Sequence, residues 1–192
     1  MPINLTKGQK IDLTKGTSLT HVNVGLGWDP VESRYADDVD CDASVVLLDS
    51  NGKVISNDYN ESTVYFSNRS LPGIRHSGDN RTGGGDGDDE TIEITFKDIQ
   101  ERVDKLVVFM NIYEASKRGQ DLSTLKNAYI RLYNPKNHDE ELCRFNLDES
   151  KGTSTGLIAG ELYRHNGEWK FAAVGEGVKD ADYVSSIVRR YM

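Results

Sequence analysis

Residues 78–90 read Gly-Asp-Asn-Arg-Thr-Gly-Gly-Gly-Asp-Gly-Asp-Asp-Glu, so that five carboxylates share a short segment with five glycines. Glycine has no Cβ, and a loop rich in it lets many oxygens converge on one point. Carboxylates this close raise one another's pKa unless a cation neutralises them. The segment therefore predicts a hard-cation site, with Ca²⁺ as the first hypothesis. The alternative is a solvated acidic turn, since runs of charge are usually exposed. The acids of the segment are Asp79, Asp86, Asp88, Asp89 and Glu90.

A second acidic run contains Asp37, Asp38, Asp40 and Asp42 and precedes an apolar stretch typical of a strand. The two-residue period of a strand places Asp38, Asp40 and Asp42 on one face, where they would repel without a counterion. Ca²⁺ takes six to eight oxygens, more than one short segment supplies. We therefore expect the two acidic segments to meet across a sandwich. The alternative is an edge strand whose charges protect it from aggregation.

A twelve-residue frame that starts at Asp79 places Gly84 at position 6 and Glu90 at position 12, as in an EF-hand. Arg81 and Gly83 stand where that motif needs Asp or Asn, and the flanks resemble strands, so we reject the EF-hand. The oxygen-rich composition of the loop remains the basis for predicting a metal site.

The two acidic segments together account for the whole formal net charge of −8. Nucleic-acid binding needs a concentrated basic face, which argues against nucleic acid as a partner. The glycines do not form a phosphate loop either, because the Gly-x-x-x-x-Gly-Lys pattern is missing.

No side chains indicate conventional catalysis, so we name no catalytic residue and expect no enzyme. A Gly-x-Ser-x-Gly signature is absent, and the four histidines are dispersed. One enzymatic alternative stays open, in which the aspartate clusters hold Mg²⁺ or Mn²⁺ in a hydrolase or phosphotransferase.

The 192 residues suit a single domain over 1–192. The amino terminus lacks the apolar region of a secretory signal, and no stretch is apolar enough for a membrane span, so we expect a cytoplasmic protein. Cys41 and Cys143 are expected to be reduced, and Cys41, between two aspartates, to be structural rather than reactive.

Alternation and turn residues predict an all-β protein, an antiparallel β-sandwich of two sheets. Two N-terminal repeats, Ile3–Gly8 and Ile11–Gly16, resemble an edge strand pair, and Asn51-Gly52 and Asn166-Gly167 predict hairpins. The other expected strands are 21–25, 43–49, 63–67, 91–96, 105–113, 128–133, 141–147, 156–163 and 168–174. Short helices are expected at 98–103, at 116–125 and at 183–190, the last capped by Asp180 or Asp182.

Four motifs resemble the TerD-type tellurium-resistance and stress-protein family. They are Gly25-Leu26-Gly27-Trp28-Asp29, Asp40-Cys41-Asp42-Ala43-Ser44, the loop 78–90, and Gly160-Glu161-Leu162-Tyr163-Arg164-His165 with Asn166-Gly167-Glu168-Trp169-Lys170-Phe171. The resemblance runs in order over nearly the whole chain. It implies a two-sheet β-sandwich that binds Ca²⁺ at paired sites, and a bacterial cytoplasmic role in tolerance of tellurite and other stresses. The family carries no firmly attached enzymatic reaction.

The same resemblance implies the metal ligands. Asp40 and Asp42 match its strand motif, the acids of the loop match its loop, Asn68 matches an asparagine of a Tyr-Asn-Asn run, and Glu114 resembles a position usually filled by Asp. Val39, Cys41 and Ser67 depart from the family pattern. The full candidate set is Asp38, Asp40, Asp42, Asn68, Asp79, Asn80, Gly84, Asp86, Asp88, Asp89, Glu90 and Glu114, and the expected cofactor is Ca²⁺, as two ions.

The expected role is a binding or scaffolding protein in which Ca²⁺ ties the two acidic segments together. The expected partners are other stress-operon proteins, with membrane-associated stress complexes as one option, and the sequence identifies no small-molecule substrate.

Overall fold

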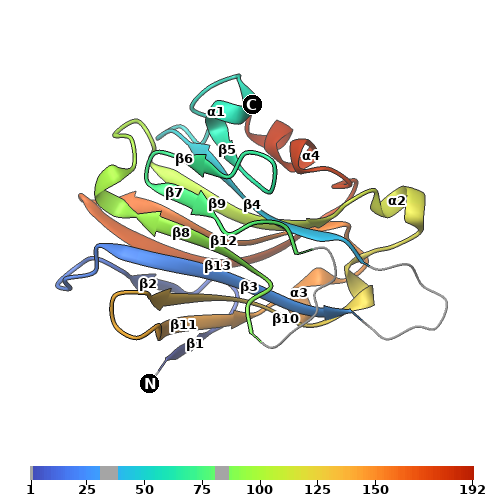
Figure 1. Ribbon diagram of the computed structural model, residues 1–192, viewed down its shortest axis with the longest axis horizontal. Coiled ribbons are helices and arrows are strands. Elements are labelled where there is room, and N and C mark those ends of the chain that lie inside the picture. Colours follow the sequence, from blue (N-terminus) through green and yellow to red (C-terminus); the bar gives the residue numbers. More distant parts are fainter. Residues whose placement is uncertain (1, 31–38, 81–86) are drawn as a thin grey trace.

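The computed structural model of the chain describes residues 2–30, 39–80 and 87–192 and forms a sandwich of two β-sheets (Figure 1). Within the described residues, one sheet has the order β1-β11-β10-β3-β8-β7-β6 and the other β2-β13-β12-β9-β4-β5. Every strand pair is antiparallel except β1 with β11. The predicted fold class, an antiparallel two-sheet sandwich with few helices, is confirmed.

The first sheet consists of β1 (Ile3–Leu5), β3 (His21–Pro30), β6 (Ser70–Leu71), β7 (Ile74–His76), β8 (Glu90–Thr95), β10 (Leu125–Asn134) and β11 (Glu140–Asn146). The second consists of β2 (Lys10–Asp12), β4 (Cys41–Leu48), β5 (Thr63–Val64), β9 (Lys105–Ile112), β12 (Gly156–His165) and β13 (Glu168–Val178). The strand predicted at 63–67 is thus only two residues long, and β3 ends five residues beyond the predicted range 21–25. The other long strands agree with the predicted ranges to within a few residues.

β4 is buried along its whole length because both of its faces are covered. Cys41, Ala43, Val45 and Leu47 point into the core between the sheets. Val46 and Leu48 point the other way, into a smaller apolar cluster beneath α4 (Val184–Val188). The sequence of a strand that is covered on both faces is usually a continuous run of apolar residues. Asp42 interrupts that run on the outer face of β4.

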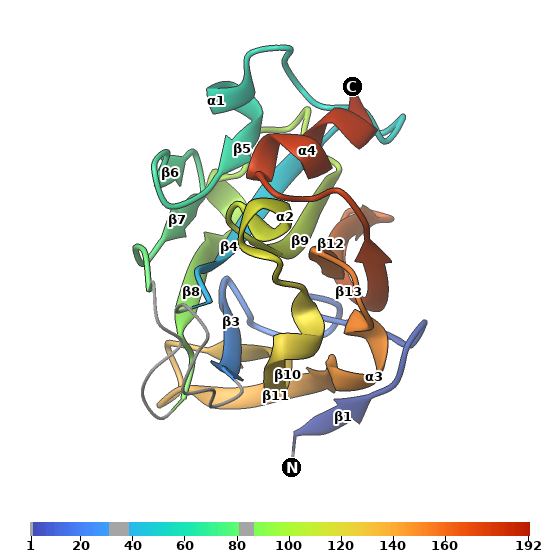
Figure 2. The same cartoon turned by 90° about the vertical axis from the view of Figure 1, so that its right-hand side faces the viewer.

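The short helices lie at the ends of the sandwich and over the outer face of β4 (Figure 2). They are α1 (Tyr59–Ser62), α2 (Ala115–Arg118), α3 (Asp148–Lys151) and α4, with 3₁₀ turns η1 (Phe96–Asp98), η2 (Leu122–Thr124) and η3 (Arg189–Tyr191). The predicted apolar stripe of the C-terminal helix is confirmed, because Val184, Ile187 and Val188 are buried. Among the described residues, no helix has the length and apolar character needed to cross a bilayer.

Three local predictions are wrong. The helix expected at 98–103 is absent, because Ile99 is extended and both Ile99 and Val103 reach the core through tight turns. The helix expected at 116–125 stops at Gly119, which adopts the left-handed conformation that ends many helices. The expected cap of α4 is also missing, since the side chain of Asp182 accepts hydrogen bonds from Ser116 instead.

The N-terminal repeats do not pair with each other. β1 pairs with β11 in the first sheet and β2 pairs with β13 in the second. The two repeats therefore form edge strands of different sheets. The Asn166-Gly167 hairpin is confirmed, because His165 pairs with Glu168 and both turn residues have positive φ, at 54° and 80°. Asn51-Gly52 also lies in a turn, but Leu48 and Val54 form only a single bridge beyond it.

Candidate metal centre

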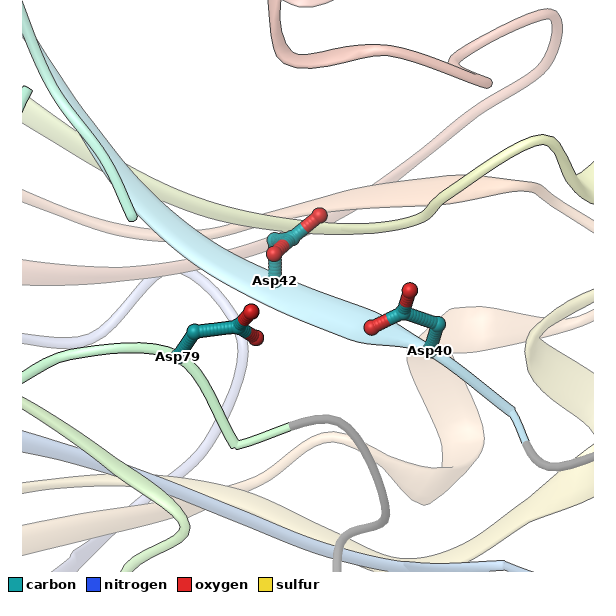
Figure 3. Close-up of side chains that lie close together, drawn as sticks. All are labelled: Asp40, Asp42 and Asp79. Carbon is teal, nitrogen blue, oxygen red and sulfur yellow. The ribbon is translucent and has the colours of Figure 1, made fainter. Parts of the chain in front are cut away.

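Asp40, Asp42 and Asp79 bring their carboxylates together at one end of β4. One oxygen from each lies within 4.8 Å of the others. Figure 3 shows Asp42 on β4, Asp40 just before that strand begins, and Asp79 approaching them from a separate segment. The three belong to the two acidic segments that the sequence analysis singled out, so the expected meeting of those segments occurs through Asp79. Hard carboxylate oxygens at this spacing match the donor chemistry of Ca²⁺.

Asp42 is the buried member of the group, with only 3% of its surface exposed. Burial, followed by the neighbouring charges of Glu90, Asp40 and Asp79, raises the pKa of Asp42 to about 8. A buried carboxylate among other acids is unfavourable, and a divalent cation would reverse that balance. The alternative of an exposed, charge-protected edge strand does not fit Asp42, because its side chain is buried.

Glu90 joins the end of β4 to the loop that carries Asp79. Its Oε2 accepts a hydrogen bond from the Ala43 N–H (2.6 Å), and its Oε1 accepts one from the Asn80 N–H (3.0 Å). His76 Nδ1 accepts from the Gly78 N–H, which leaves the proton on Nε2, 2.9 Å from the Ala43 carbonyl oxygen. Glu90 and His76 therefore hold β4 against residues 78–80, and this contact sets the position of Asp79.

Asp89 and Asn80 fix the same loop against β3. The carboxylate of Asp89 accepts from the Trp28 N–H (2.8 Å) and from the Asn80 side-chain amide (2.9 Å). Burial raises the pKa of Asp89, while the bond from Trp28 opposes that rise. Both of these predicted ligands thus use their side chains to hold the loop in place.

Asp88 lies on the outer face of the first sheet, in an ion pair with Arg131. Its two oxygens accept from Arg131 Nε (2.7 Å) and from the second guanidinium nitrogen (2.9 Å), and Tyr129 donates its hydroxyl to the first. The carboxylate occupies the space above Gly25, where a Cβ would lie 2.1 Å from Asp88 Oδ2. The glycine of the Gly25-Leu26-Gly27 motif therefore makes room for an acid of the loop.

The remaining predicted ligands are more scattered. Asn68 donates its side-chain amide to the carbonyls of Asn60 and Thr63, both at 2.7 Å. Glu114 follows Tyr113, whose N–H bonds the Asp40 carbonyl, but its own carboxylate pairs with Lys117 at 2.9 Å. Asp38, Gly84 and Asp86 lie outside the described residues.

One polar residue next to the centre escaped the sequence analysis. Asn111 of β9 pairs with Asp42 across the sheet, is fully buried, and has neither its amide nitrogen nor its carbonyl oxygen hydrogen-bonded. Buried side-chain amides without partners are uncommon, since leaving them unpaired is costly. The signal in the sequence was a single asparagine inside the apolar run from Leu106 to Ile112.

Both cysteines are buried and unpaired. Burial and the nearby acids raise the pKa of Cys41 well above its ordinary value, and burial raises that of Cys143 to about 12. Neither thiol is therefore poised to form the reactive thiolate.

Comparisons with known proteins agree over almost the entire chain. The model of the TerD domain matches residues 1–191. The chain is 43% identical over 205 residues to stress response protein SCP2 of Bacillus subtilis (strain 168), with 100% of each chain covered. It is 42% identical over 194 residues to tellurium resistance protein TerD of Serratia marcescens, covering 100% of this chain and 97% of that one. A crystal structure of a homologue of telluride resistance protein (TerD) from Streptomyces coelicolor A3(2) has the same fold, with a TM-score of 0.69 at 20% identity over 85% of this chain and 92% of that one.

Proposed function

The chain belongs to the TerD domain family, and from this premise we propose that it is a calcium-binding protein of the stress response associated with tellurite resistance. The observation that carries the calcium assignment is the approach of Asp79 to Asp40 and Asp42 within 4.8 Å. The charges that act on Asp42 are those of other acids, and a bound cation relieves their repulsion.

In this proposal the ion joins two parts of the chain that no strand pairing connects. Asp40 and Asp42 belong to the start of the β4 region, whereas Asp79 follows β7 in the other sheet. An ion bound by all three stabilises the folded state, by about 2.7 kcal/mol when Ca²⁺ is at 100 times its dissociation constant. Calcium then acts both as part of the structure and as the signal that sets its stability.

We further propose that the calcium-loaded protein is a scaffold for other stress-operon proteins, membrane-associated complexes among them, and that it works in the cytoplasm. The unpaired cysteines support a reducing compartment. Asn80, Asp88, Asp89 and Glu90 then position the loop, and Asp86 is the one acid of residues 78–90 that is left for a second ion.

The calcium assignment is tested by calorimetric titration of the chelator-treated protein with CaCl₂ and with MgCl₂, alongside thermal melts in each salt and in EGTA. We expect Ca²⁺ to bind and to raise the melting temperature more than Mg²⁺ does. Asp79→Asn should weaken Ca²⁺ binding about tenfold or more, because it removes the charge of one of the three carboxylate ligands. Asp139→Asn is the matched control, since it removes one exposed carboxylate outside the cluster. Equal affinity in both variants would overturn the assignment.

For the hydrolase or phosphotransferase alternative, two metal ions about 3.5–4 Å apart would be needed. Among the described residues, a single group of three carboxylates meets the geometry for a metal, and no observation favours the alternative. A phosphatase and nuclease screen with Mg²⁺ and Mn²⁺ accompanies the titration, and turnover that Asp42→Asn abolishes would restore this alternative.

A further inference from the structure

A pocket of about 200 Å³ lies on the outer face of the second sheet and shares Asp42 with the metal centre. We call it the tyrosine pocket. Its lining consists of Asp42, Tyr59, Tyr65, Phe66, Tyr113, Tyr183, Val184 and Ser185. Figures 1 and 2 show α1 with β5 and the start of α4 side by side above β4, and these segments carry residues of the lining. Segments from four regions of the sequence thus gather aromatic rings around one carboxylate.

The rings of the tyrosine pocket support one another in fixed orientations. Tyr59 and Tyr65 form an edge-to-face pair at 5.1 Å, and Tyr65 forms another with Phe66 at 5.4 Å. On the opposite wall, Tyr113 and Tyr183 form an edge-to-face pair at 5.7 Å. Such pairs add stability beyond the area that they bury, so the walls are formed before any ligand arrives.

The lining of the pocket favours a cation, because it includes five aromatic rings and no lysine, arginine or histidine. The faces of tyrosine and phenylalanine rings carry negative potential and attract cations within about 6 Å. The Tyr113 ring at the rim already attracts a cation, because the Arg118 guanidinium lies 5.5 Å from the centre of this ring.

We propose that the tyrosine pocket binds a quaternary ammonium group. A primary ammonium is strongly hydrated and has three N–H donors to satisfy, whereas the surface of this pocket is mostly apolar. A trimethylammonium group has no N–H to satisfy, and its methyl groups suit the apolar lining. The volume is below the roughly 300–1,000 Å³ of pockets for drug-sized ligands, so the pocket takes a small head group. The cation–π argument uses only the rings, so the inference is separate from the calcium proposal although Asp42 also lines the pocket.

Choline is the test ligand, and 3,3-dimethylbutan-1-ol is its neutral counterpart of the same shape. We expect calorimetry of the full chain in EGTA to give an affinity for choline about tenfold or more above that for the neutral alcohol, since desolvated cation–π contacts contribute about 2 kcal/mol. Choline binding that is absent, or no tighter than that of the alcohol, would overturn the proposal. EGTA removes calcium from the experiment, so this result is separate from that of the calcium titration.

Variants of Tyr183 assign the binding to the pocket, because this ring is 47% exposed and its loss should leave the fold intact. We expect Tyr183→Leu to weaken choline binding about two- to fivefold, whereas Tyr183→Phe, which keeps the ring, retains it. Tyr163→Leu, on β12 and outside the pocket, is the matched control, and thermal melts check that each variant is folded. Equal choline affinity in Tyr183→Leu and Tyr163→Leu would contradict the assignment.

The pocket could take its quaternary ammonium group from a free amine or from the head group of a lipid. Co-sedimentation with phosphatidylcholine vesicles distinguishes these two ligands. Choline binding without vesicle binding assigns the pocket to a free quaternary amine. Vesicle binding that Tyr183→Leu weakens and Tyr163→Leu does not assigns it to the lipid head group.

Discussion

Asp42 combines two properties that rarely occur together, since it is nearly buried and its closest charged neighbours are acids. Burial first, and then the charges of Glu90, Asp40 and Asp79, raise its pKa to about 8. Without a cation, the folded chain therefore keeps this carboxyl protonated at neutral pH. Calcium binding has to displace that proton, which makes the site sensitive to pH.

The first prediction concerns this proton. In EGTA the unfolded chain releases it near pH 4 and the folded chain near pH 8, so the folded state binds more protons in between. The contribution of Asp42 to the free energy of unfolding is largest below about pH 4 and falls by about 1.4 kcal/mol per pH unit as the pH rises towards 8. At pH 7, Ca²⁺ binding should release about one proton, measured as the dependence of the calorimetric enthalpy on buffer ionisation. Asp42→Asn should remove both effects, and an unchanged proton release in that variant would contradict the assignment to Asp42.

The second prediction separates Asp88 from Asp79. Both oxygens of Asp88 are bound to Arg131, so Asp88→Asn should lower the free energy of unfolding by about 1–3 kcal/mol, equally in EGTA and in CaCl₂. Asp79 is exposed, and Asp79→Asn should reduce the stabilisation by calcium while leaving stability in EGTA nearly unchanged. Thermal melts of both variants in both solutions provide the comparison. If Asp88→Asn loses calcium binding, Asp88 is a metal ligand, and its assignment to the ion pair alone is wrong.

At the scale of elements, the centre depends on how β4 meets the loop between β7 and β8. β5 pairs with β4 only at Val45 and Val46, which leaves the edge of β4 at Ala43 free for Glu90 and His76. These contacts replace strand pairing and join the two sheets at the site of the acids. The position of Asp79 is thus a property of this junction rather than of the loop alone.

The third prediction tests the junction. Glu90→Gln keeps the size of the side chain but replaces one of the two oxygens that accept from Ala43 and Asn80. We expect a loss of about 1–3 kcal/mol in stability and weaker Ca²⁺ binding, with the number of bound ions unchanged, as measured by calorimetry. Glu93→Gln, exposed on the same strand, is the control. A reduced number of ions would instead make Glu90 a ligand.

At the scale of the molecule, the sandwich shares one apolar core between its sheets, and an ion at their junction should stabilise both. The fourth prediction is that Ca²⁺ at 100 times its dissociation constant slows hydrogen exchange of core amides about 100-fold in both sheets. Amides of β10 and β13, outside the junction, are the ones to follow, with KCl of equal ionic strength as the control. Slowing confined to β4 and residues 78–80 would mean that the chain does not unfold as the single domain predicted over 1–192.

Local patterns predicted the parts of the fold that local physics decides. The Asn166-Gly167 hairpin follows from two residues that tolerate positive φ, and the long strands follow from their alternation or continuous apolar runs. The wrong predictions depended on distant contacts. Ile99 and Val103 have helical spacing but are buried through turns, and Asp182 bonds to Ser116, 66 residues away. Propensity is too weak to resist such tertiary contacts.

For the site, the sequence by itself determined the chemistry, which is an excess of carboxylates in two segments, with Asp40 and Asp42 on one face of a strand. Only the tertiary structure decided which acids meet, because Asp79 reaches Asp40 and Asp42 while Asp88 turns to Arg131, and Asp89 and Glu90 accept from backbone N–H groups. The same holds for the tyrosine pocket, whose rings are scattered from Tyr59 to Tyr183. The physical reason is that alternation specifies the face of a side chain within its own strand, whereas its neighbours across the molecule depend on how separate strands and loops pack.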